Sequence, residues 1–423
     1  MRAKALLAAG MAAALGLALA GCGSSSSGGT DTGSGSTKSA ASGSEIKLGV
    51  VTPLTGPYSS GFTTVEKAVK ARLAVENAKG GIDGHKLTYV MADDLGTPAG
   101  ALAAAKKLIQ QDHVYGILDA SPVFYGAAPA VKAANVPVAG SSWDGGPEWL
   151  DKSYTTFFDG FGYANYELSA STYGEIFKNQ KCTKVGGVGN TGPSSGRAAE
   201  AAVISAQKAG MQAGYLNTKL APDTTDVGPA VLGIKSSGTD CVYVPVTPAL
   251  AFALVAGLKQ AGVNMKVILL PTGYGGDILQ NKSGVQAAQG VDFMTSGSPV
   301  ELQTDATKAF QEALAKYADE TNIPTFGEYV GWTIADLFVY GLKQAGGDAS
   351  QADFVSALRA SDGWDNGGLY QKPTKFADPA PQAGSFGPGN CTNVVKLTGE
   401  KFVPLEGLAP ICGTILDGVK ISE

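Results

Sequence analysis

The feature of this sequence that most constrains its fold is a regular alternation of short apolar runs with amphipathic segments. Residues 46–51 form an apolar run that predicts a β-strand, and residues 63–78 place Val65, Val69 and Leu73 on one helix face. The same alternation continues to about residue 139. Strands that alternate with helices at this spacing predict βαβ units, in which helices cover a parallel sheet.

A second alternation begins after residues 154–162. The predicted strands lie at residues 184–188, 214–220, 241–246, 266–270 and 291–294, and the helices between them at 195–209, 227–236 and 250–261. Two successive alternations of similar length predict an α/β fold with two similar lobes and not one very wide sheet. Two further helices are predicted at 306–318 and 331–345, and residues 393–397 and 401–405 predict a hairpin.

The N-terminus has the layout of an export signal. Arg2 and Lys4 precede an apolar stretch at residues 5–20, and small residues then lead to Cys22. A cysteine in this position resembles the lipidation site of bacterial lipoproteins, so residues 1–21 are predicted to be a signal peptide. A transmembrane helix is the alternative, but the apolar stretch is short and no basic cluster follows it. We therefore expect an exported protein, held on the outer face of the cytoplasmic membrane by a lipid on Cys22.

Residues 22–44 are predicted to be a flexible tether. The segment consists almost entirely of Gly, Ser and Thr, and it cannot bury enough apolar surface to become ordered. The whole chain has a formal net charge of −5. Because it has no surplus of basic side chains to neutralise phosphates, we expect no nucleic-acid partner.

Four cysteines remain in the body of an exported chain, which favours two disulfides. Four cysteines permit three connectivities. Cys182 and Cys241 both lie just before predicted strands of the second alternation, and adjacent parallel strands would bring them together. Cys391 would then pair with Cys412. Four buried free thiols are the alternative, and no C-x-x-C spacing indicates a zinc site.

Two glycine-rich motifs suggest enzymes, and the residues around them argue against both. Residues 187–192 match G-x-G-x-x-G, but the next predicted strand does not end in the acidic residue that a dinucleotide site needs. Residues 192–196 match G-x-S-x-G, but both histidines, His85 and His113, precede Ser194, whereas that chemistry needs a later histidine. We therefore predict no enzyme, no catalytic residue, no cofactor and no metal.

Several stretches carry a family resemblance. They are residues 46–56 (IKLGVVTPLTG), residues 80–87 (GGIDGHKL), Ala127 and Pro129 with Val136-Pro137, and residues 147–150 (PEWL). In this order they resemble the opening strand, the turn after the first helix and the next landmarks of the branched-chain amino-acid-binding proteins. Those proteins are type I solute-binding proteins of ABC importers. The resemblance extends over about residues 45–420.

This resemblance implies two Rossmann-like lobes with parallel sheets, joined by three crossing strands. The crossings are expected near residues 157–161, 296–300 and 363–369. The lobes are expected to comprise residues 45–160 with 300–365, and residues 161–299 with 366–423. A monomer of this kind would capture one small ligand between its lobes and deliver it to the permease and ATPase subunits of an ABC transporter. A ligand-sensing module that serves a membrane receptor is the alternative role.

The resemblance also implies a ligand site at the strand ends. In the first lobe Ser121, Ser142 and Trp143 would hold a carboxylate, and the loop with Tyr58 and Ser59 would close over it. In the second lobe, Asn190 lies in the glycine-rich loop, and Ser195 replaces the tyrosine of the family.

The family's acid for a ligand ammonium falls in residues 271–276, which contain no carboxylate before Asp277. Phe124, Trp143 and Tyr274 would instead present flat apolar faces. We therefore expect a small apolar or aromatic, carboxylate-bearing ligand in preference to a branched-chain amino acid. A one-residue shift in the alignment would place Asp277 or Asp144 at the ammonium and restore amino-acid binding.

Overall fold

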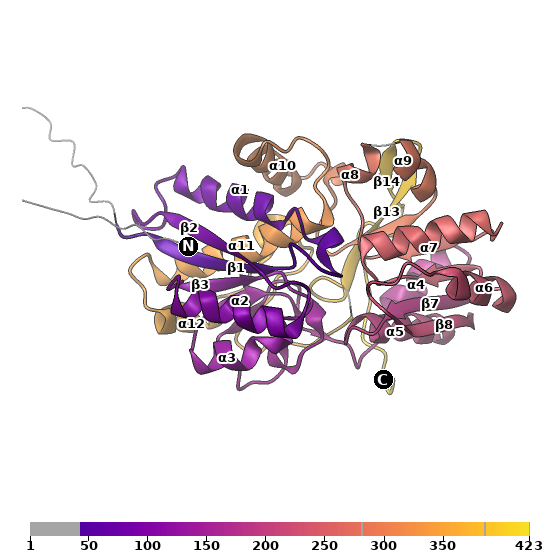
Figure 1. Cartoon of the computed structure of the whole chain (residues 1–423), viewed down its shortest axis with the longest axis horizontal. Helices are drawn as coiled ribbons and strands as arrows, with labels where there is room; N and C mark the ends of the chain where they lie inside the picture. Colours follow the sequence, from indigo (N-terminus) through magenta and orange to yellow (C-terminus); the bar gives the residue numbers. More distant parts are fainter. Residues whose placement is uncertain (1–42, 281, 385, 423) are drawn as a thin grey trace, which may run out of the picture. The chain divides into compact units, whose positions relative to one another are not determined.

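The computed structural model describes residues 43–280, 282–384 and 386–422, and two β-sheets organise them (Figure 1). The predicted signal peptide, Cys22 and almost all of the predicted tether lie outside the described residues. The first sheet is parallel and has the order β2-β1-β3-β4-β5. Its strands are β1 (Ile46–Thr52), β2 (Leu87–Asp93), β3 (Gly116–Asp119), β4 (Val138–Gly140) and β5 (Phe157–Asp159).

Helices cover both faces of the first sheet because its central strands are apolar on both sides. One face packs against α1 (Val65–Asn77), α11 (Phe326–Ala345) and α12 (Gln351–Arg359). The other packs against α2 (Pro98–Gln110) and α3 (Ala128–Ala133). Figure 1 shows α1 and α2 on opposite sides of the strands. A further helix, α10 (Asp305–Ala318), packs against α1.

The second sheet has the order β14-β13-β11-β10-β9-β7-β8, and five of its strands are parallel. These are β7 (Lys184–Asn190), β8 (Gln212–Leu220), β9 (Cys241–Tyr243), β10 (Val267–Leu270) and β11 (Asp292–Thr295). The predicted hairpin forms β13 (Cys391–Thr398) and β14 (Lys401–Pro404), and β13 pairs antiparallel with β11. The predicted α/β fold of two parallel-sheet lobes is thus confirmed.

Helices also cover both faces of the second sheet. One face packs against α4 (Ser171–Asn179) and α5 (Ser195–Lys208), and the other against α6 (Gly228–Ser237) and α7 (Pro248–Gln260). The short helices α8 (Gly276–Leu279) and α9 (Lys282–Ala288) follow β10.

A small parallel sheet lies where the chain passes between the lobes. It pairs β6 (Ala164–Asn165), which follows the first sheet, with β12 (Gln382–Ala383), which precedes β13. Trp364, Tyr370 and Phe376 pack in the core of the first lobe, and the Tyr370 hydroxyl donates to Gly160 O at 2.9 Å. The third crossing of the chain therefore follows Phe376 and does not lie near residues 363–369.

Both predicted disulfides are present. Cys182, just before β7, is bonded to Cys241 at the start of the neighbouring strand β9. Cys391 in β13 is bonded to Cys412 in the short strand β15 (Ile411–Cys412), and the two residues are opposite each other in the ladder. Each disulfide thus joins two neighbouring strands of the second lobe.

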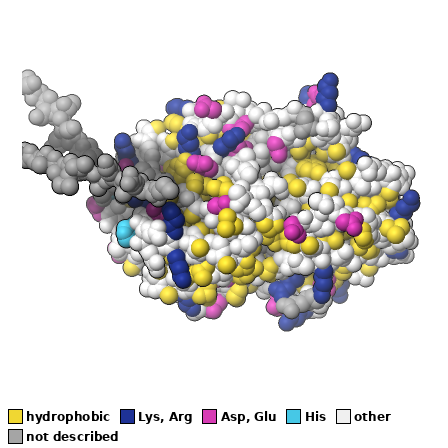
Figure 2. Space-filling model, in the orientation of Figure 1, with side chains coloured by type: hydrophobic (Ala, Val, Ile, Leu, Met, Phe, Trp, Pro, Cys, Tyr) yellow, Lys and Arg dark blue, Asp and Glu magenta, His cyan; other side chains and the backbone are white. Residues whose placement is uncertain are grey.

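Two properties of the described part bear on partners. None of its helices combines the length and apolar character that crossing a membrane requires. Figure 2 shows basic and acidic side chains interspersed over the visible face. This agrees with the small net charge of the chain.

Candidate ligand-binding site

A cavity of about 150 Å³ lies where the loops of the two lobes meet. The segments that follow β1, β3, β4 and β5 of the first lobe contribute Tyr58, Phe62, Pro122, Trp143 and Phe161 to its lining. The segments that follow β7, β9 and β10 of the second lobe contribute Ser194, Thr247 and Tyr274. Ligands of parallel α/β sheets bind beyond the carboxyl ends of the strands, and this cavity lies there in both sheets.

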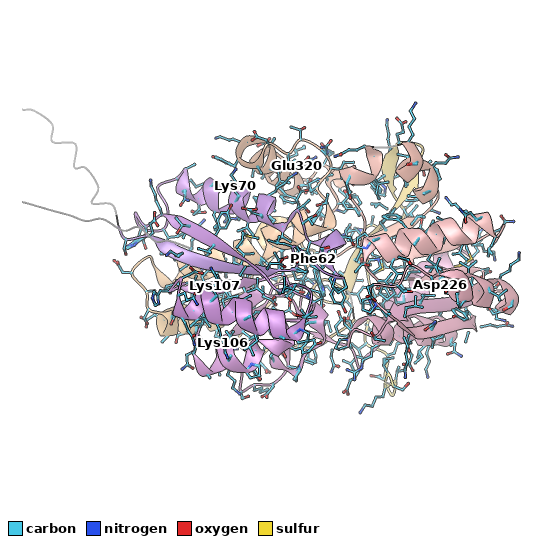
Figure 3. The ribbon with its side chains drawn as sticks, viewed as in Figure 1. Phe62, Lys70, Lys106, Lys107, Asp226 and Glu320 are labelled. Carbon is cyan, nitrogen blue, oxygen red and sulfur yellow. A yellow bond between two sulfur atoms is a disulfide. The ribbon has the colours of Figure 1, made fainter. Side chains whose placement is uncertain are left out.

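Aromatic rings form one wall of the cavity. The Trp143 ring lies 4.1 Å from the Phe161 ring and 5.2 Å from the Phe326 ring, measured between centroids, and it is stacked on Phe326. The Phe62 ring meets Phe326 edge to face at 5.7 Å. Figure 3 shows Phe62 beyond the strand ends of the first sheet, on the side that faces α7. These rings offer a flat apolar surface to a ligand.

The opposite wall belongs to the second lobe and is more polar. Asn190 ends β7, and its Oδ1 accepts a hydrogen bond from Gly192 N at 2.8 Å. Ser194 and Thr247 precede α5 and α7 and also line the cavity. Tyr58 lies on the first-lobe side of the same cavity, and burial raises its pKa to about 12, so its hydroxyl stays protonated at neutral pH. The polar groups on this lining are therefore neutral.

The lining contains no Asp, Glu, Lys, Arg or His among the described residues. Asp277 is exposed in the first turn of α8 and does not line the cavity. Asp144 is fully buried, and its Oδ1 accepts hydrogen bonds from Gly146 N at 3.0 Å and Trp149 Nε1 at 2.9 Å. A ligand ammonium in this cavity would thus have no carboxylate partner from either candidate.

The structure brings five of the predicted site residues together. Tyr58, Trp143, Asn190, Ser195 and Tyr274 all line the cavity. The Ser195 hydroxyl is already engaged, because it donates to Pro245 O and accepts from Asn190 N at 2.9 Å. The Tyr274 hydroxyl donates to Glu301 Oε2 at 2.7 Å. Ser195 and Tyr274 therefore shape the cavity more than they offer free polar atoms.

Four other predicted residues lie outside the lining. The Ser59 hydroxyl donates to Gly56 O at 2.9 Å. The Ser121 hydroxyl accepts from Val123 N at 3.1 Å, and the Ser142 hydroxyl accepts from Ala164 N at 2.8 Å. Phe124 is fully buried and packs beside Phe157, so its expected role at the ligand is corrected to core packing. The two buried serines hold loops in place because each satisfies a main-chain N–H group.

Several lining residues were missed in the sequence. Phe161 follows β5. From the sequence, residues 157–161 were expected to cross between the lobes, so no strand end with a site residue was predicted there. Phe326 and Tyr329 begin α11 upstream of the predicted helix start. Thr247 was within reach of sequence reasoning, because Pro248 marks a helix start directly after a predicted strand.

Buried acids lie behind the first-lobe wall. Burial raises the pKa of Asp119 and of Asp144 well above the usual range, and a neighbouring carboxyl raises each further. Burial also raises the pKa of Glu148, close to Asp144. Among the described residues, no group of three or more His, Cys, Asp or Glu is arranged to hold a metal ion. These carboxyls are neutral for much of the acidic range and do not form a cation site.

The two lobes touch at the rim of the cavity. Gly145, after β4, adopts φ +68°, and a Cβ atom built on it would lie 3.1 Å from Ser194 N of the second lobe. A Cβ atom built on Gly192 would lie 3.5 Å from the Tyr58 hydroxyl. Glycine at residue 145 thus allows a close approach to the main chain of the opposite lobe, whereas the distance at Gly192 is an ordinary van der Waals contact.

Comparison with known proteins agrees with this geometry. A family model described as periplasmic binding protein matches residues 45–398. The Leu/Ile/Val-binding protein homolog 3 of Brucella melitensis is 26% identical over 332 residues, which cover 76% of this chain and 84% of that protein.

Two solved structures share the fold. A fatty acid ABC transporter substrate-binding protein from Thermomonospora curvata has a TM-score of 0.71 at 20% identity, covering 87% of this chain and 92% of that chain. An ABC transporter solute-binding protein from R. palustris, in complex with benzoate, has a TM-score of 0.67 at 18% identity, covering 89% and 98%. The chain therefore belongs to the periplasmic binding protein family, and it is a type I solute-binding protein.

Proposed function

We propose that this protein is the extracytoplasmic binding component of an ABC importer. It captures one small organic ligand between its lobes and releases the ligand unaltered to a permease that ATPase subunits drive. The observation that supports this role is the cavity itself, which both lobes line at their strand ends. A ligand held there contacts both lobes at once, so it stabilises the closed arrangement over an open one.

We propose an apolar or aromatic, carboxylate-bearing ligand in preference to a free branched-chain amino acid. Transfer of an ammonium from water into a site without an anion is costly, and the described lining contains no carboxylate. The names of the similar proteins mention different ligands: one is named for leucine, isoleucine and valine, one for fatty acids, and one was solved with benzoate. The aromatic wall of this chain favours the apolar end of that range.

Thermal unfolding with and without ligand tests the capture of a solute. A ligand at about one hundred times its dissociation constant stabilises the native state by about 2.7 kcal/mol. At roughly 2–4 °C per kcal/mol, the midpoint should rise by about 5–10 °C. Recovery of the ligand unchanged after incubation would support binding without catalysis, and recovery of a chemically altered product would contradict it.

Trp143→Ala should weaken binding by about tenfold or more, since it removes the ring that stacks on Phe326. Tyr317→Ala is the matched control, because it truncates a half-buried ring on α10 outside the cavity. Equal affinities in the two variants would show that the ligand binds elsewhere.

We further propose that a lipid on Cys22 anchors the mature protein and that the body acts as a monomer. Cys22→Ala should leave the precursor unprocessed or release the protein from membranes on fractionation. A Cys22→Ala protein that is still processed and still membrane-bound through its N-terminus would contradict the anchor.

A further inference from the structure

The amide of Asn190 presents a free donor to the cavity. Asn190 is only 3% exposed, and it lines the cavity at the end of β7. Its orientation is fixed, because Oδ1 accepts the hydrogen bond from Gly192 N at 2.8 Å. The Nδ2 group therefore faces away from that bond, and it has no hydrogen-bond partner among the described residues. A donor of a largely buried side chain that opens onto a cavity and has no protein partner indicates a ligand acceptor.

A second unpaired group lies on the same wall. Thr247 is 8% exposed, lines the cavity and occupies the position before α7, but its hydroxyl makes no capping bond. Ser194 occupies the same position before α5, and its hydroxyl makes no capping bond either. Hydroxyls at these positions ordinarily accept from the first turn of a helix. Here both remain available to a bound molecule.

The first turns of α5 and α7 consequently keep their partial positive charge at the cavity. The first main-chain hydrogen bond of α5 runs from Ala198 N to Ser194 O, and that of α7 runs from Ala251 N to Thr247 O. The N–H groups that precede Ala198 and Ala251 in these helices therefore have no acceptor within the helix. A third helix that begins at the cavity, α11, differs. Its N-terminus is closed by a capping box, in which Thr325 Oγ1 accepts from Glu328 N at 3.3 Å and Glu328 Oε2 accepts from Thr325 N at 2.7 Å. Two of the three helix starts thus remain open to an anion.

The two first-lobe serines that the sequence predicted at the ligand, Ser121 and Ser142, offer no free polar group to the cavity. The Ser121 and Ser142 hydroxyls each accept a main-chain N–H bond and lie outside the lining. Trp143 and Phe161 present rings to the cavity instead. Apart from the Tyr58 hydroxyl, the first-lobe end of the cavity is therefore apolar, whereas the second-lobe end donates hydrogen bonds.

We propose that the second lobe binds the ligand carboxylate, between Asn190 Nδ2, Thr247 and the first turns of α5 and α7, and that the apolar body of the ligand lies against the Trp143 wall. This inference rests on the proposed solute-binding function and names the ligand class: monocarboxylates with an apolar or aromatic body and no ammonium group. The orientation is opposite to the one that the sequence led us to expect. A cavity of about 150 Å³ in another protein holds a benzene ring, so a single ring fits this one.

Calorimetric titration of the wild-type protein at pH 7 compares the affinities for three head groups. The probes are phenylacetate, 2-phenylacetamide and L-phenylalanine. The three compounds share a ring and differ in charge. Phenylacetate should bind about tenfold or more tightly than the amide, because hydrogen bonds and helix starts favour the charged acceptor. Phenylalanine should bind most weakly, because its ammonium finds no anion.

Two variants test the position of the head group. Asn190→Asp keeps the oxygen that accepts from Gly192 N and replaces the donor with an anion. It should invert the preference, so that the amide binds more tightly than the acid. Thr247→Val removes a hydroxyl with little change in shape and should weaken phenylacetate about tenfold. Ser59→Ala is the control, since Ser59 lies outside the lining and the acid affinity should be unchanged.

Each outcome decides the inference. If Asn190→Asp and Thr247→Val retain their unfolding midpoints and bind phenylacetate as the wild type does, the carboxylate is held elsewhere. Should Asn190→Asp fail to fold, the phenylacetate affinity of the double variant Ser194→Ala with Thr247→Val tests the same position of the carboxylate. If L-phenylalanine or L-leucine binds more tightly than phenylacetate, the inference is wrong while the solute-binding function stands. If none of these probes binds, the inference is also wrong. Native mass spectrometry of the purified protein then shows whether another small molecule is captured, and the proposed function is judged by that result.

Discussion

Gly145 is a residue of the first lobe that lies directly against main chain of the second lobe. It has φ +68°, which a side chain disfavours, and a Cβ atom there would lie 3.1 Å from Ser194 N. That contact distance requires the neighbouring main chain to give way by a few tenths of an ångström. Any side chain at residue 145 therefore opposes closure of the two lobes, in addition to its backbone strain.

Gly145→Ala and Gly238→Ala separate these two effects. Gly238 also has φ +68°, at the end of α6, but a Cβ atom there meets nothing within 4 Å. Both variants should lose about 1 kcal/mol of unfolding free energy from backbone strain. Only Gly145→Ala should also weaken ligand binding. The affinity should fall about fivefold for each kcal/mol by which the closed arrangement of the lobes is destabilised.

Chemical denaturation and calorimetric titration of both proteins measure the two quantities. Equal loss of affinity in the two variants would show that strain alone matters and that the lobes do not close at Gly145.

At this scale the sequence predicted the cavity residues that directly follow strands. Trp143, Asn190 and Tyr274 were found because strand ends are visible in an apolar pattern. The hydrogen-bond partners of individual serine hydroxyls could not be predicted from the sequence. Ser121 and Ser195 differ only in which main-chain N–H and C=O groups come within reach of them, and that depends on loop geometry after folding.

Helix α11 shows where element prediction fails. The sequence predicted a start at residue 331, and the helix begins at Phe326. The missed signal is a capping box, in which Thr325 Oγ1 accepts from Glu328 N and Glu328 accepts from Thr325 N. Glycines at 327 and 331 obscured it. They are there because α11 approaches α1 closely, and a Cβ atom on Gly331 would lie 2.3 Å from Val65 O.

Glu328 should make the stability of the fold depend on pH. Burial raises the pKa of this carboxyl to about 7. Between the usual glutamate pKa and pH 7, the folded state thus binds more protons than the unfolded state, so the unfolding free energy falls as the pH rises through this window. Glu328→Gln keeps the capping acceptor and removes the titration. The fall between pH 5 and pH 8 should shrink by about 1 kcal/mol or more in this variant.

Denaturation at several pH values measures that slope for the wild type and the variant. The control is Glu312→Gln, an exposed position on α10, which should leave the slope unchanged. A slope that Glu328→Gln does not alter would contradict the raised pKa of Glu328.

The stability of the whole molecule depends on its two disulfides, which close loops with separations of 59 and 21 residues. In the loop-entropy model each contributes on the order of 3–4 kcal/mol. Paired replacement of Cys182 and Cys241 by Ala should lower the unfolding midpoint by about 10 °C, and so should paired replacement of Cys391 and Cys412. Non-reducing peptide mapping checks the pairing in the protein itself. Four thiols that react with an alkylating agent would contradict both bonds.

The strand order has a consequence for how a nascent chain acquires structure. All strands of the first sheet have emerged by residue 159, but α11, α12 and Phe376 close one face of its core. The second sheet likewise waits for β13, which begins at Cys391. A ribosome-bound chain stopped near residue 300 would therefore carry a first sheet with one incompletely covered apolar face and a second sheet that still lacks β13 and β14. Both lobes become complete almost together, as the last segment of the polypeptide is released.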